Sequence, residues 1–262
     1  MNKSITLRIP AHPDRTRDLG WDPGRALHRI MNRTRDLDPR LQFTLTCEAT
    51  GRAVSITPSC VRLDRPRTVL GWLRAMADES PNAQEYMLRL AAACERLKTV
   101  NPASVTGHLF IDMDGVAADF DSAYPTVFGH HHSWVSQEVM WANIDSDHLF
   151  YSRLQPMRGF VELYAAIKHL PHSFLSVSRT AAIAGLKKKW LHTHLDERAR
   201  LIPVYGFSKG LFAHPGDRLI DDHEFNIRDF EKAGGIGIEY TDVLSVANAL
   251  VRAYAHPDWS NS

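Results

Sequence analysis

The chain of 262 residues is long enough for two modest domains or one large one, and its 44% hydrophobic content is ample for a buried core. No apolar run approaches the ~18 residues of a membrane span, and the first ten residues lack the apolar core of a signal peptide. The three cysteines, Cys47, Cys60 and Cys94, form no Cys-x-x-Cys pair. We therefore expect a cytoplasmic protein with reduced cysteines and no membrane segment.

The formal net charge of +1 is unevenly distributed along the chain. Residues 1–105 carry 17 Lys+Arg against 11 Asp+Glu, whereas residues 106–262 carry 14 against 19. Such a split indicates two domains with different partners. Arginines make up 15 of the 17 basic residues in the first part. They could bind nucleic-acid phosphates or a partner protein, although surface salt bridges are the commoner use of arginine.

Residues 1–104 mix the patterns of strands and helices. The segment 4–9 alternates apolar and polar residues like a strand, and residues 42–57 have the pattern of a hairpin. Apolar residues recur at helical spacing in three further segments: 21–37, 67–77 and 82–98. These signals predict a small N-terminal α+β domain that ends near residue 104.

The second domain, residues 105–262, alternates strands and helices. Five short apolar runs are typical of strands: 108–111, 173–177, 200–204, 218–220 and 235–240. Helical patterns occur in four segments: 159–170, 181–195, 225–233 and 242–255. Apolar strands separated by helices predict an α/β fold in which helices cover both faces of a parallel sheet. Ligands of such folds bind beyond the carboxyl ends of the strands.

Two aspartates, Asp112 and Asp114, directly follow the first of these strands in the segment HLFIDMDGVAADF. Carboxylates two residues apart at the end of a buried strand repel each other and resist desolvation, so their presence needs a physical reason. An EF-hand calcium loop is excluded, because its final Glu would fall at Ala123. The pair could simply cap a turn, or it could bind a divalent cation.

Polar residues at later strand ends favour the cation site. The segment DMDGV resembles the first motif of the haloacid dehalogenase (HAD) superfamily of phosphohydrolases, and Asp221-Asp222 resembles its last motif. Between these motifs the family has a hydroxyl and a lysine, for which this chain offers Ser176 and Lys209. The resemblance implies a HAD-like parallel sheet with helices on both faces.

The resemblance also implies a role for each residue. Asp112 would be the nucleophile, and Ser176 and Lys209 would hold the phosphoryl oxygens. Asp114 would protonate the leaving alcohol and then accept a proton from the attacking water. The Mg²⁺ ligands would come from the acidic set: Asp112, the backbone carbonyl of Asp114, and one or both of Asp221 and Asp222.

A closer resemblance concerns the substrate. The segment DMDGVAADF is similar to the opening of the 5'(3')-deoxyribonucleotidases, in which an aromatic residue at the position of Phe120 lines the nucleoside pocket. The segments SWVS and LFYSRLQPMRGFVELYAAI also resemble that family. We therefore expect Trp134 and Val135 to contact the substrate from a small helical cap at about residues 121–155.

The chain departs from that family at one motif. It has Ser176-Val177-Ser178 where the family usually has Thr-Ser-Pro, and we assign Ser178 to substrate binding. Two basic runs match no motif of the family. We expect Lys187–Lys189 on a solvated helix face and His130–His132 in a solvated loop of the cap.

These observations favour a Mg²⁺-dependent phosphomonoesterase, and specifically a 5'-nucleotidase that acts on (deoxy)nucleoside monophosphates. One alternative is a phosphatase that acts on nucleic-acid ends, in which the basic N-terminal half would bind the strand. Steep salt dependence would identify it, because many phosphate contacts weaken as salt rises. Another alternative is a non-catalytic HAD-like binding protein, against which the intact acidic set argues. Assembly into a homo-oligomer stays open.

Overall fold

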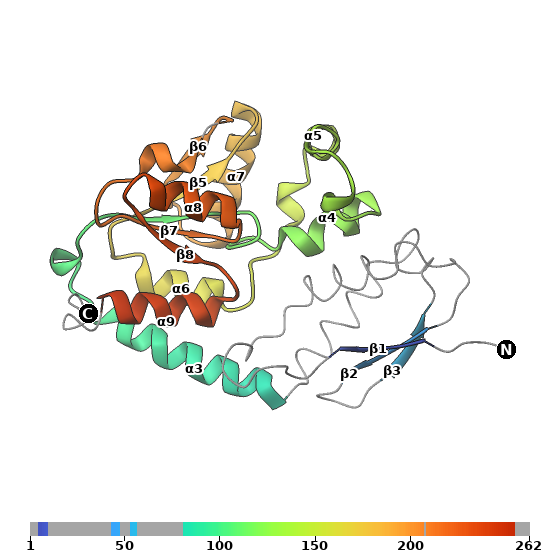
Figure 1. The fold of residues 1–262 in the computed structure, drawn as a ribbon, viewed down its shortest axis with the longest axis horizontal. Helices are drawn as coiled ribbons and strands as arrows, with labels where there is room; N and C mark the ends of the chain where they lie inside the picture. Colours follow the sequence, from blue (N-terminus) through green and yellow to red (C-terminus); the bar gives the residue numbers. More distant parts are fainter. Residues whose placement is uncertain (1–4, 10–42, 48–52, 57–80, 207, 255–262) are drawn as a thin grey trace. The chain divides into compact units, whose positions relative to one another are not determined.

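The computed structural model of the chain describes residues 5–9, 43–47, 53–56, 81–206 and 208–254 (Figure 1). The chain divides into two compact units, one comprising residues 1–86 and 120–143 and the other residues 87–119 and 144–262. The described residues include a five-stranded parallel sheet and seven α-helices. The predicted α/β class is therefore confirmed.

The second unit is built on the parallel sheet, whose strand order is β6-β5-β4-β7-β8. The strands are β4 (Leu109–Ile111), β5 (His172–Val177), β6 (Leu201–Val204), β7 (Arg218–Asp221) and β8 (Ile236–Glu239). Each coincides with a predicted strand. The chain passes from β4 to β5 and β6 on one side, then returns to β7 and β8 on the other. Ligands of open parallel sheets bind where the order reverses in this way, which here is the carboxyl end of β4.

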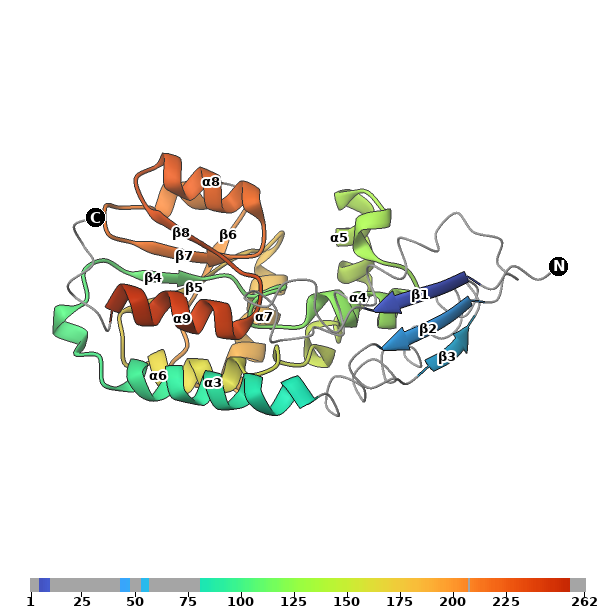
Figure 2. The ribbon, with the colours of Figure 1, turned by 60° about the horizontal axis from the view of Figure 1, so that its bottom comes forward.

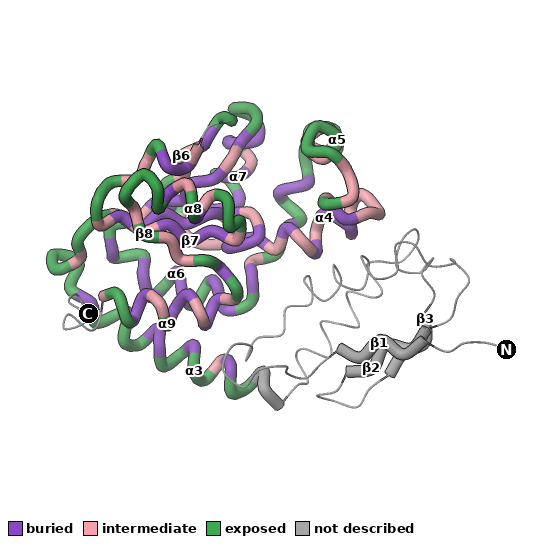
Figure 3. The backbone as a smooth tube through the Cα atoms, viewed as in Figure 1, coloured by how far each residue is buried: buried purple, intermediate pink, exposed green. Residues whose placement is uncertain are grey.

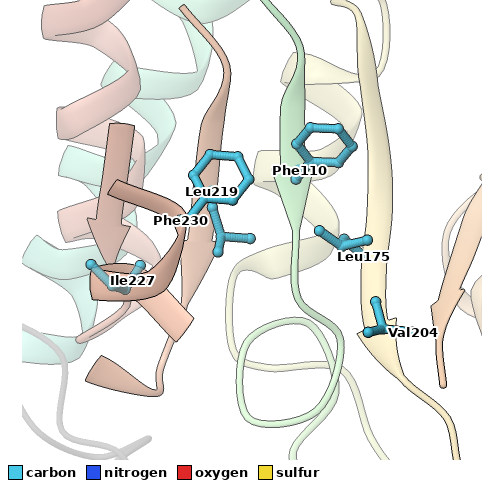
Figure 4. Packing of buried hydrophobic residues seen from close by; sticks show 6 residues of the cluster. All are labelled: Phe110, Leu175, Val204, Leu219, Ile227 and Phe230. Carbon is cyan, nitrogen blue, oxygen red and sulfur yellow. The ribbon is translucent and has the colours of Figure 1, made fainter. Parts of the chain in front are cut away.

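One face of this sheet packs on α8 (Glu224–Lys232). Figure 4 shows Phe110, Leu175 and Leu219 on three neighbouring strands, in one apolar cluster with Phe230 of α8. The rings of Phe110 and Phe230 meet edge to face with centroids 5.9 Å apart, an arrangement that aromatic pairs favour. This cluster anchors the strands from which the candidate site projects.

The opposite face is covered by α6 (Phe160–Ile167), with α3 (Pro81–Lys98) and α9 (Val243–Tyr254) on the same side (Figure 2). Phe174 of β5 packs against Tyr164 of α6, with ring centroids 5.8 Å apart. Along α9, buried and exposed residues alternate as in an amphipathic helix (Figure 3). Helices therefore cover both faces of the sheet, as predicted.

Helix α7 (Ala181–His194) begins where the side chain of Thr180 accepts a hydrogen bond from the backbone N–H of Ile183. Trp190, on its buried side, donates from Nε1 to the carbonyl of Leu154 at 2.9 Å. The helix contacts β6 and completes the predicted set of helices in this unit. None of the described helices is both long and apolar enough to cross a lipid bilayer.

The first unit contains a separate three-stranded sheet. β1 (Ile5–Ile9) pairs in parallel with β2 (Phe43–Cys47), and β2 pairs antiparallel with β3 (Ala53–Ile56). The predicted first strand and the predicted hairpin are therefore confirmed. The helices predicted at 21–37 and 67–77 lie outside the described residues.

The segment predicted as a cap, residues 121–155, is largely helical. It contains α4 (Phe120–Phe128), α5 (Gln137–Ser146) and two short 3₁₀ helices, η3 (His132–Trp134) and η4 (Tyr151–Arg153). Its helical character agrees with the prediction, and its role as a cap stays a prediction.

Helix α3 continues into the sheet unit, to which it belongs from Met87 onward. Its inward residues Leu90, Cys94 and Leu97 recur at helical spacing and are all buried. Burial raises the pKa of the Cys94 thiol from 9.0 to about 11. The expectation of a structural thiol therefore fits Cys94.

Cys94 should resist alkylation in the folded protein. A pKa near 11 lowers the thiolate fraction about 100-fold relative to an ordinary cysteine, and burial limits access further. Iodoacetamide labelling at neutral pH, mapped by mass spectrometry, should modify Cys94 rapidly only after unfolding in urea. Equal labelling of this residue with and without urea would contradict its burial.

Candidate active site

Three carboxylates converge at the carboxyl ends of the neighbouring strands β4 and β7. Asp112 follows β4, Asp221 is the last residue of β7, and Asp222 comes next. The backbone N–H of Asp112 donates to the carbonyl of Ile220 at 2.9 Å, which extends the ladder between the strands. One oxygen from each carboxylate lies within 4.8 Å of the others. The parallel sheet thus gathers residues that are more than a hundred positions apart in sequence.

The ammonium of Lys209 neutralises two of these carboxylates. Lys209 begins the 3₁₀ helix η5 (Lys209–Phe212), and its side chain is only 1% exposed. Its Nζ lies 2.9 Å from Oδ1 of Asp112 and 2.5 Å from Oδ2 of Asp221. Burial lowers the pKa of Lys209, but the charges of Asp112 and Asp221 raise it by more, so the lysine stays protonated. Lys209 lies where the sequence predicted, and its catalytic role stays a prediction.

Asp221 is held by further donors. The backbone N–H of His223 donates to Oδ1 at 2.9 Å, and Nδ2 of Asn226 lies 3.0 and 3.1 Å from the two carboxylate oxygens. Burial raises the pKa of Asp221, the charge of Asp112 raises it further, and Lys209 opposes both. Asn226 was not predicted from the sequence, although a polar residue in the first helical turn after Asp221-Asp222 was a usable signal.

Gly115 lets Asp222 approach the loop that follows β4. Its φ of +78° suits glycine, and a Cβ at this position would lie 2.4 Å from Oδ2 of Asp222. The same loop is tightened by the carbonyl of Met113, which accepts N–H bonds from three residues: Val116, Ala117 and Ala118. A larger residue at position 115 would require the carboxylate of Asp222 or the loop to shift.

A second buried lysine, Lys187, reaches the site from α7. Its side chain is fully buried, and Nζ donates to Oδ2 of Asp114 at 2.7 Å, to Oγ of Ser176 at 2.9 Å and to the carbonyl of Val177 at 2.6 Å. Lys187 therefore links Asp114, the predicted proton donor, to Ser176, the predicted phosphate-binding hydroxyl.

The two lysines approach from opposite faces of the sheet. Side chains alternate between faces along a strand, so Asp112, two residues after Phe110, points to the face that carries α8. Ser176, two residues after Phe174, points to the face that carries α6. Lys209 accordingly contacts Asp112 on one face, and Lys187 contacts Ser176 on the other.

The predicted solvated face at Lys187–Lys189 is wrong for Lys187, while Lys188 and Lys189 are exposed. The apolar pattern of α7 carried the missed signal. Lys187 lies four residues after Ile183 and three before Trp190, and both of these are buried. A lysine on the inward stripe of a helix is buried only with partners, and here the partners belong to the candidate site.

The two oxygens of Asp114 are placed differently. Oδ2 accepts from Lys187 and, at 3.2 Å, from the hydroxyl of Tyr151, whereas the buried Oδ1 has no hydrogen-bond partner among the described residues. Burial raises the pKa of Asp114 above its ordinary value; Lys187 opposes this shift and the charge of Asp112 adds to it. A raised pKa suits a carboxyl group that must carry a proton to a leaving group.

Ser178 follows β5, the strand that carries Ser176. It is fully buried, its N–H donates to the carbonyl of Val204 at 2.9 Å, and its Oγ has no hydrogen-bond partner within the described part of the chain. A buried hydroxyl without a partner is costly, so Ser178 has a donor to offer at this strand end. Its assignment to substrate binding stays a prediction.

Phe120, Trp134 and Val135 belong to the other compact unit. Phe120 is buried, with its ring stacked on Tyr124 at 5.7 Å and edge-on to His132 at 5.3 Å. Trp134 and Val135 are partly exposed. The packing of Phe120 explains its aromatic character without a substrate, and a role of these three residues in substrate binding stays a prediction.

A second group of potential metal ligands occurs in that unit, where Asp121, His131 and His132 offer donor atoms within 4.8 Å of one another. The backbone N–H of Ser133 donates to Nδ1 of His131 at 3.2 Å, and Nε2 of His132 lies 2.9 Å from Oδ1 of Asp121. We interpret this group as a hydrogen-bonded cluster. The predicted solvated loop at His130–His132 is wrong for His131, which is buried.

The acidic set at the sheet fits Mg²⁺, a hard cation that takes oxygen ligands. Asp112, Asp221 and Asp222 would hold it through carboxylate oxygens that already converge. The side chain of Asp114 is not part of this convergence, because its Oδ2 is turned toward Lys187. The assignment of the backbone carbonyl of Asp114 as a ligand stays a prediction.

Lys209→Met should destabilise the protein in metal-free buffer. It removes the cation between Asp112 and Asp221, and breaking a buried ion pair typically costs about 3–5 kcal/mol. Urea unfolding in EDTA should show this loss, and Mg²⁺ should restore more stability to the variant than to the wild type. Lys232→Met, at an exposed position, is the control. An unchanged free energy of unfolding in EDTA would contradict the neutralising role of Lys209.

Neither a protein-family model nor a curated protein matches the sequence. The functional assignment therefore depends on the residues and on the geometry described above.

Proposed function

We propose that the chain is a Mg²⁺-dependent phosphomonoesterase of the HAD type that hydrolyses (deoxy)nucleoside monophosphates through an aspartyl-phosphate. The observation that carries the proposal is the convergence of Asp112, Lys209 and Asp221 at the strand ends, with Asp114 and Ser176 joined by a buried lysine beside them. A nucleophile, a proton donor and phosphate-binding donors are the groups that phosphoryl transfer to a carboxylate requires.

In the first step, a carboxylate oxygen of Asp112 bonds to phosphorus while the bond from phosphorus to the ester oxygen breaks. Asp114 transfers its proton to that ester oxygen, which leaves as the neutral alcohol. Lys209 and Ser176 donate hydrogen bonds to the phosphoryl oxygens as their charge redistributes. Bound Mg²⁺ would supply the charge neutralisation that allows one anion to approach another.

In the second step, water attacks the phosphorus of the aspartyl-phosphate. Asp114, now a carboxylate, accepts the proton that the water loses. The bond between phosphorus and the Asp112 oxygen breaks, inorganic phosphate leaves, and both aspartates return to their starting states. One residue thus serves as acid and then as base.

The nucleotide preference depends on the resemblance of DMDGVAADF to the 5'(3')-deoxyribonucleotidases and on the helical segment with Trp134. An aromatic ring could stack on a base, which is worth roughly 1–3 kcal/mol. The same site could accept a 3'-phosphorylated strand if the arginine-rich N-terminal part engaged its backbone. The two substrates differ in charge, which makes them separable by experiment.

A screen of phosphate release tests the proposal. The full chain should release phosphate from 2'-deoxynucleoside 5'-monophosphates faster than from glycerol phosphate, and EDTA should stop the reaction. Activity should change little between low and moderate salt. Preference for 3'-phosphorylated oligonucleotides, with a steep loss of binding as salt rises, would favour the nucleic-acid end phosphatase. No release from any substrate with Mg²⁺ present would contradict the enzymatic proposal.

A further inference from the structure

The ammonium of Lys187 has three N–H donors, and the described residues accept from it at three atoms. These are Oδ2 of Asp114, Oγ of Ser176 and the carbonyl oxygen of Val177, at 2.7, 2.9 and 2.6 Å. Lys187 is therefore fully engaged with protein groups and has no donor left for a substrate. Its action on any reaction must pass through the groups that it holds.

The contact with Ser176 fixes the direction of its hydroxyl. An ammonium can only donate, so Oγ of Ser176 is the acceptor in this pair. The O–H of Ser176 is consequently available to donate elsewhere. A phosphoryl oxygen at the strand ends would be a suitable acceptor for it.

The contact with Asp114 distinguishes the two oxygens of the carboxyl group. Oδ2 accepts from both Lys187 and the hydroxyl of Tyr151. Two donors already point at Oδ2, so Oδ1 is the oxygen that can carry a proton without displacing either of them. Oδ1 is the oxygen that has no partner among the described side chains and backbone groups.

We propose that Lys187 is a positioning residue that holds Asp114 so that Oδ1 carries the proton to the leaving oxygen. The inference rests on the proposed phosphatase function. It adds a second lysine, from the opposite face of the sheet to Lys209, with a separate task. Lys209 serves the nucleophile, and Lys187 serves the proton donor and the hydroxyl of Ser176.

The test compares two leaving groups of similar size. Phenol needs a proton as it departs, whereas 4-nitrophenolate is stable enough to leave without one. Single-turnover release of each product, with enzyme in excess, isolates the first step. Lys187→Met should slow release from phenyl phosphate by about 10²-fold or more and from 4-nitrophenyl phosphate by less than about tenfold, because general acid catalysis contributes 10²–10⁴ where it is needed.

Two further measurements separate positioning from general damage. Calorimetric binding of Mg²⁺ should be unchanged in Lys187→Met, because Lys187 contacts none of the three converging carboxylates of the metal set. Lys188→Met, on the exposed side of the same helix, should match the wild type on both substrates. If Lys187→Met does not fold, Lys187→Gln, which keeps two N–H donors, should show the same selective loss with a smaller magnitude.

The outcomes distinguish this inference from the proposed function. Equal losses on the two substrates in an active protein would overturn the positioning role and leave the phosphatase intact. A wild-type protein that releases neither product with Mg²⁺ would overturn the phosphatase and the inference together. A selective loss with normal Mg²⁺ binding supports both.

Discussion

Asp112→Asn should abolish phosphate release. An amide nitrogen or oxygen is a poor nucleophile toward phosphorus, and removal of the nucleophile from an enzyme that works by covalent catalysis typically costs about 10⁴-fold or more. Oδ1 of Asp112 lies 2.9 Å from Nζ of Lys209, so the variant also loses the negative charge that balances this buried ammonium. Initial rates with Mg²⁺ and a nucleoside monophosphate would measure the loss.

The control for this variant is Glu197→Gln, the same carboxylate-to-amide change at an exposed position. It should retain the wild-type rate. Thermal unfolding in the presence of Mg²⁺ should show that Asp112→Asn is folded. Near-normal turnover by a folded Asp112→Asn protein would contradict both the assignment of Asp112 as the nucleophile and the proposed mechanism.

Asp114→Asn should lower turnover by about 10²- to 10⁴-fold, the range that general acid–base catalysis contributes. The amide retains an oxygen that Lys187 can approach, but it offers no acidic proton to the leaving alcohol. The backbone carbonyl is unchanged, so calorimetry should show retained Mg²⁺ binding. The loss should be largest for alkyl phosphates, whose leaving groups are most basic.

A distinct outcome would contradict this role. If Asp114→Asn lost Mg²⁺ binding and activity in parallel, with equal losses for alkyl and 4-nitrophenyl phosphates, the side chain would be a metal ligand. The present position of Oδ2, turned toward Lys187 and Tyr151, argues for the proton-transfer role.

The sheet and the acidic cluster were predictable because both follow from local pattern. Short apolar runs separated by helical segments specify parallel strands, and the carboxyl ends of such strands meet along one edge. Asp112 and Asp221 each follow an apolar run directly, so their convergence required no knowledge of side-chain packing. Lys209 was found from the order of motifs in the resemblance, and its burial between the two aspartates is a feature of the structure.

Lys187 was not predictable from composition, because three successive lysines look like a solvated helix face. Only the helical phase distinguishes Lys187, which lies on the buried stripe, from Lys188 and Lys189, which do not. Tyr151, which donates to the same oxygen of Asp114 as Lys187, comes from η4, far from Lys187 in sequence, and no local pattern could bring the two together. The orientation of Asp114 depends on these long-range contacts.

The environment of Phe120 shows a different limit. The resemblance predicts a ring that lines a nucleoside pocket, and in the structure the ring packs against Tyr124 and His132. An aromatic residue at a motif position is compatible with packing as well as with stacking, and sequence alone does not separate the two.

Trapping the covalent intermediate tests the central claim most directly. The full chain, mixed with Mg²⁺ and a nucleoside monophosphate and quenched during turnover, would be treated with borohydride, which reduces an aspartyl-phosphate to homoserine. Peptide mapping should then find homoserine at position 112, and at none of Asp114, Asp221 or Asp222. Homoserine at another aspartate, or a fully active protein without any borohydride-sensitive residue, would contradict the assignment of Asp112 as the nucleophile.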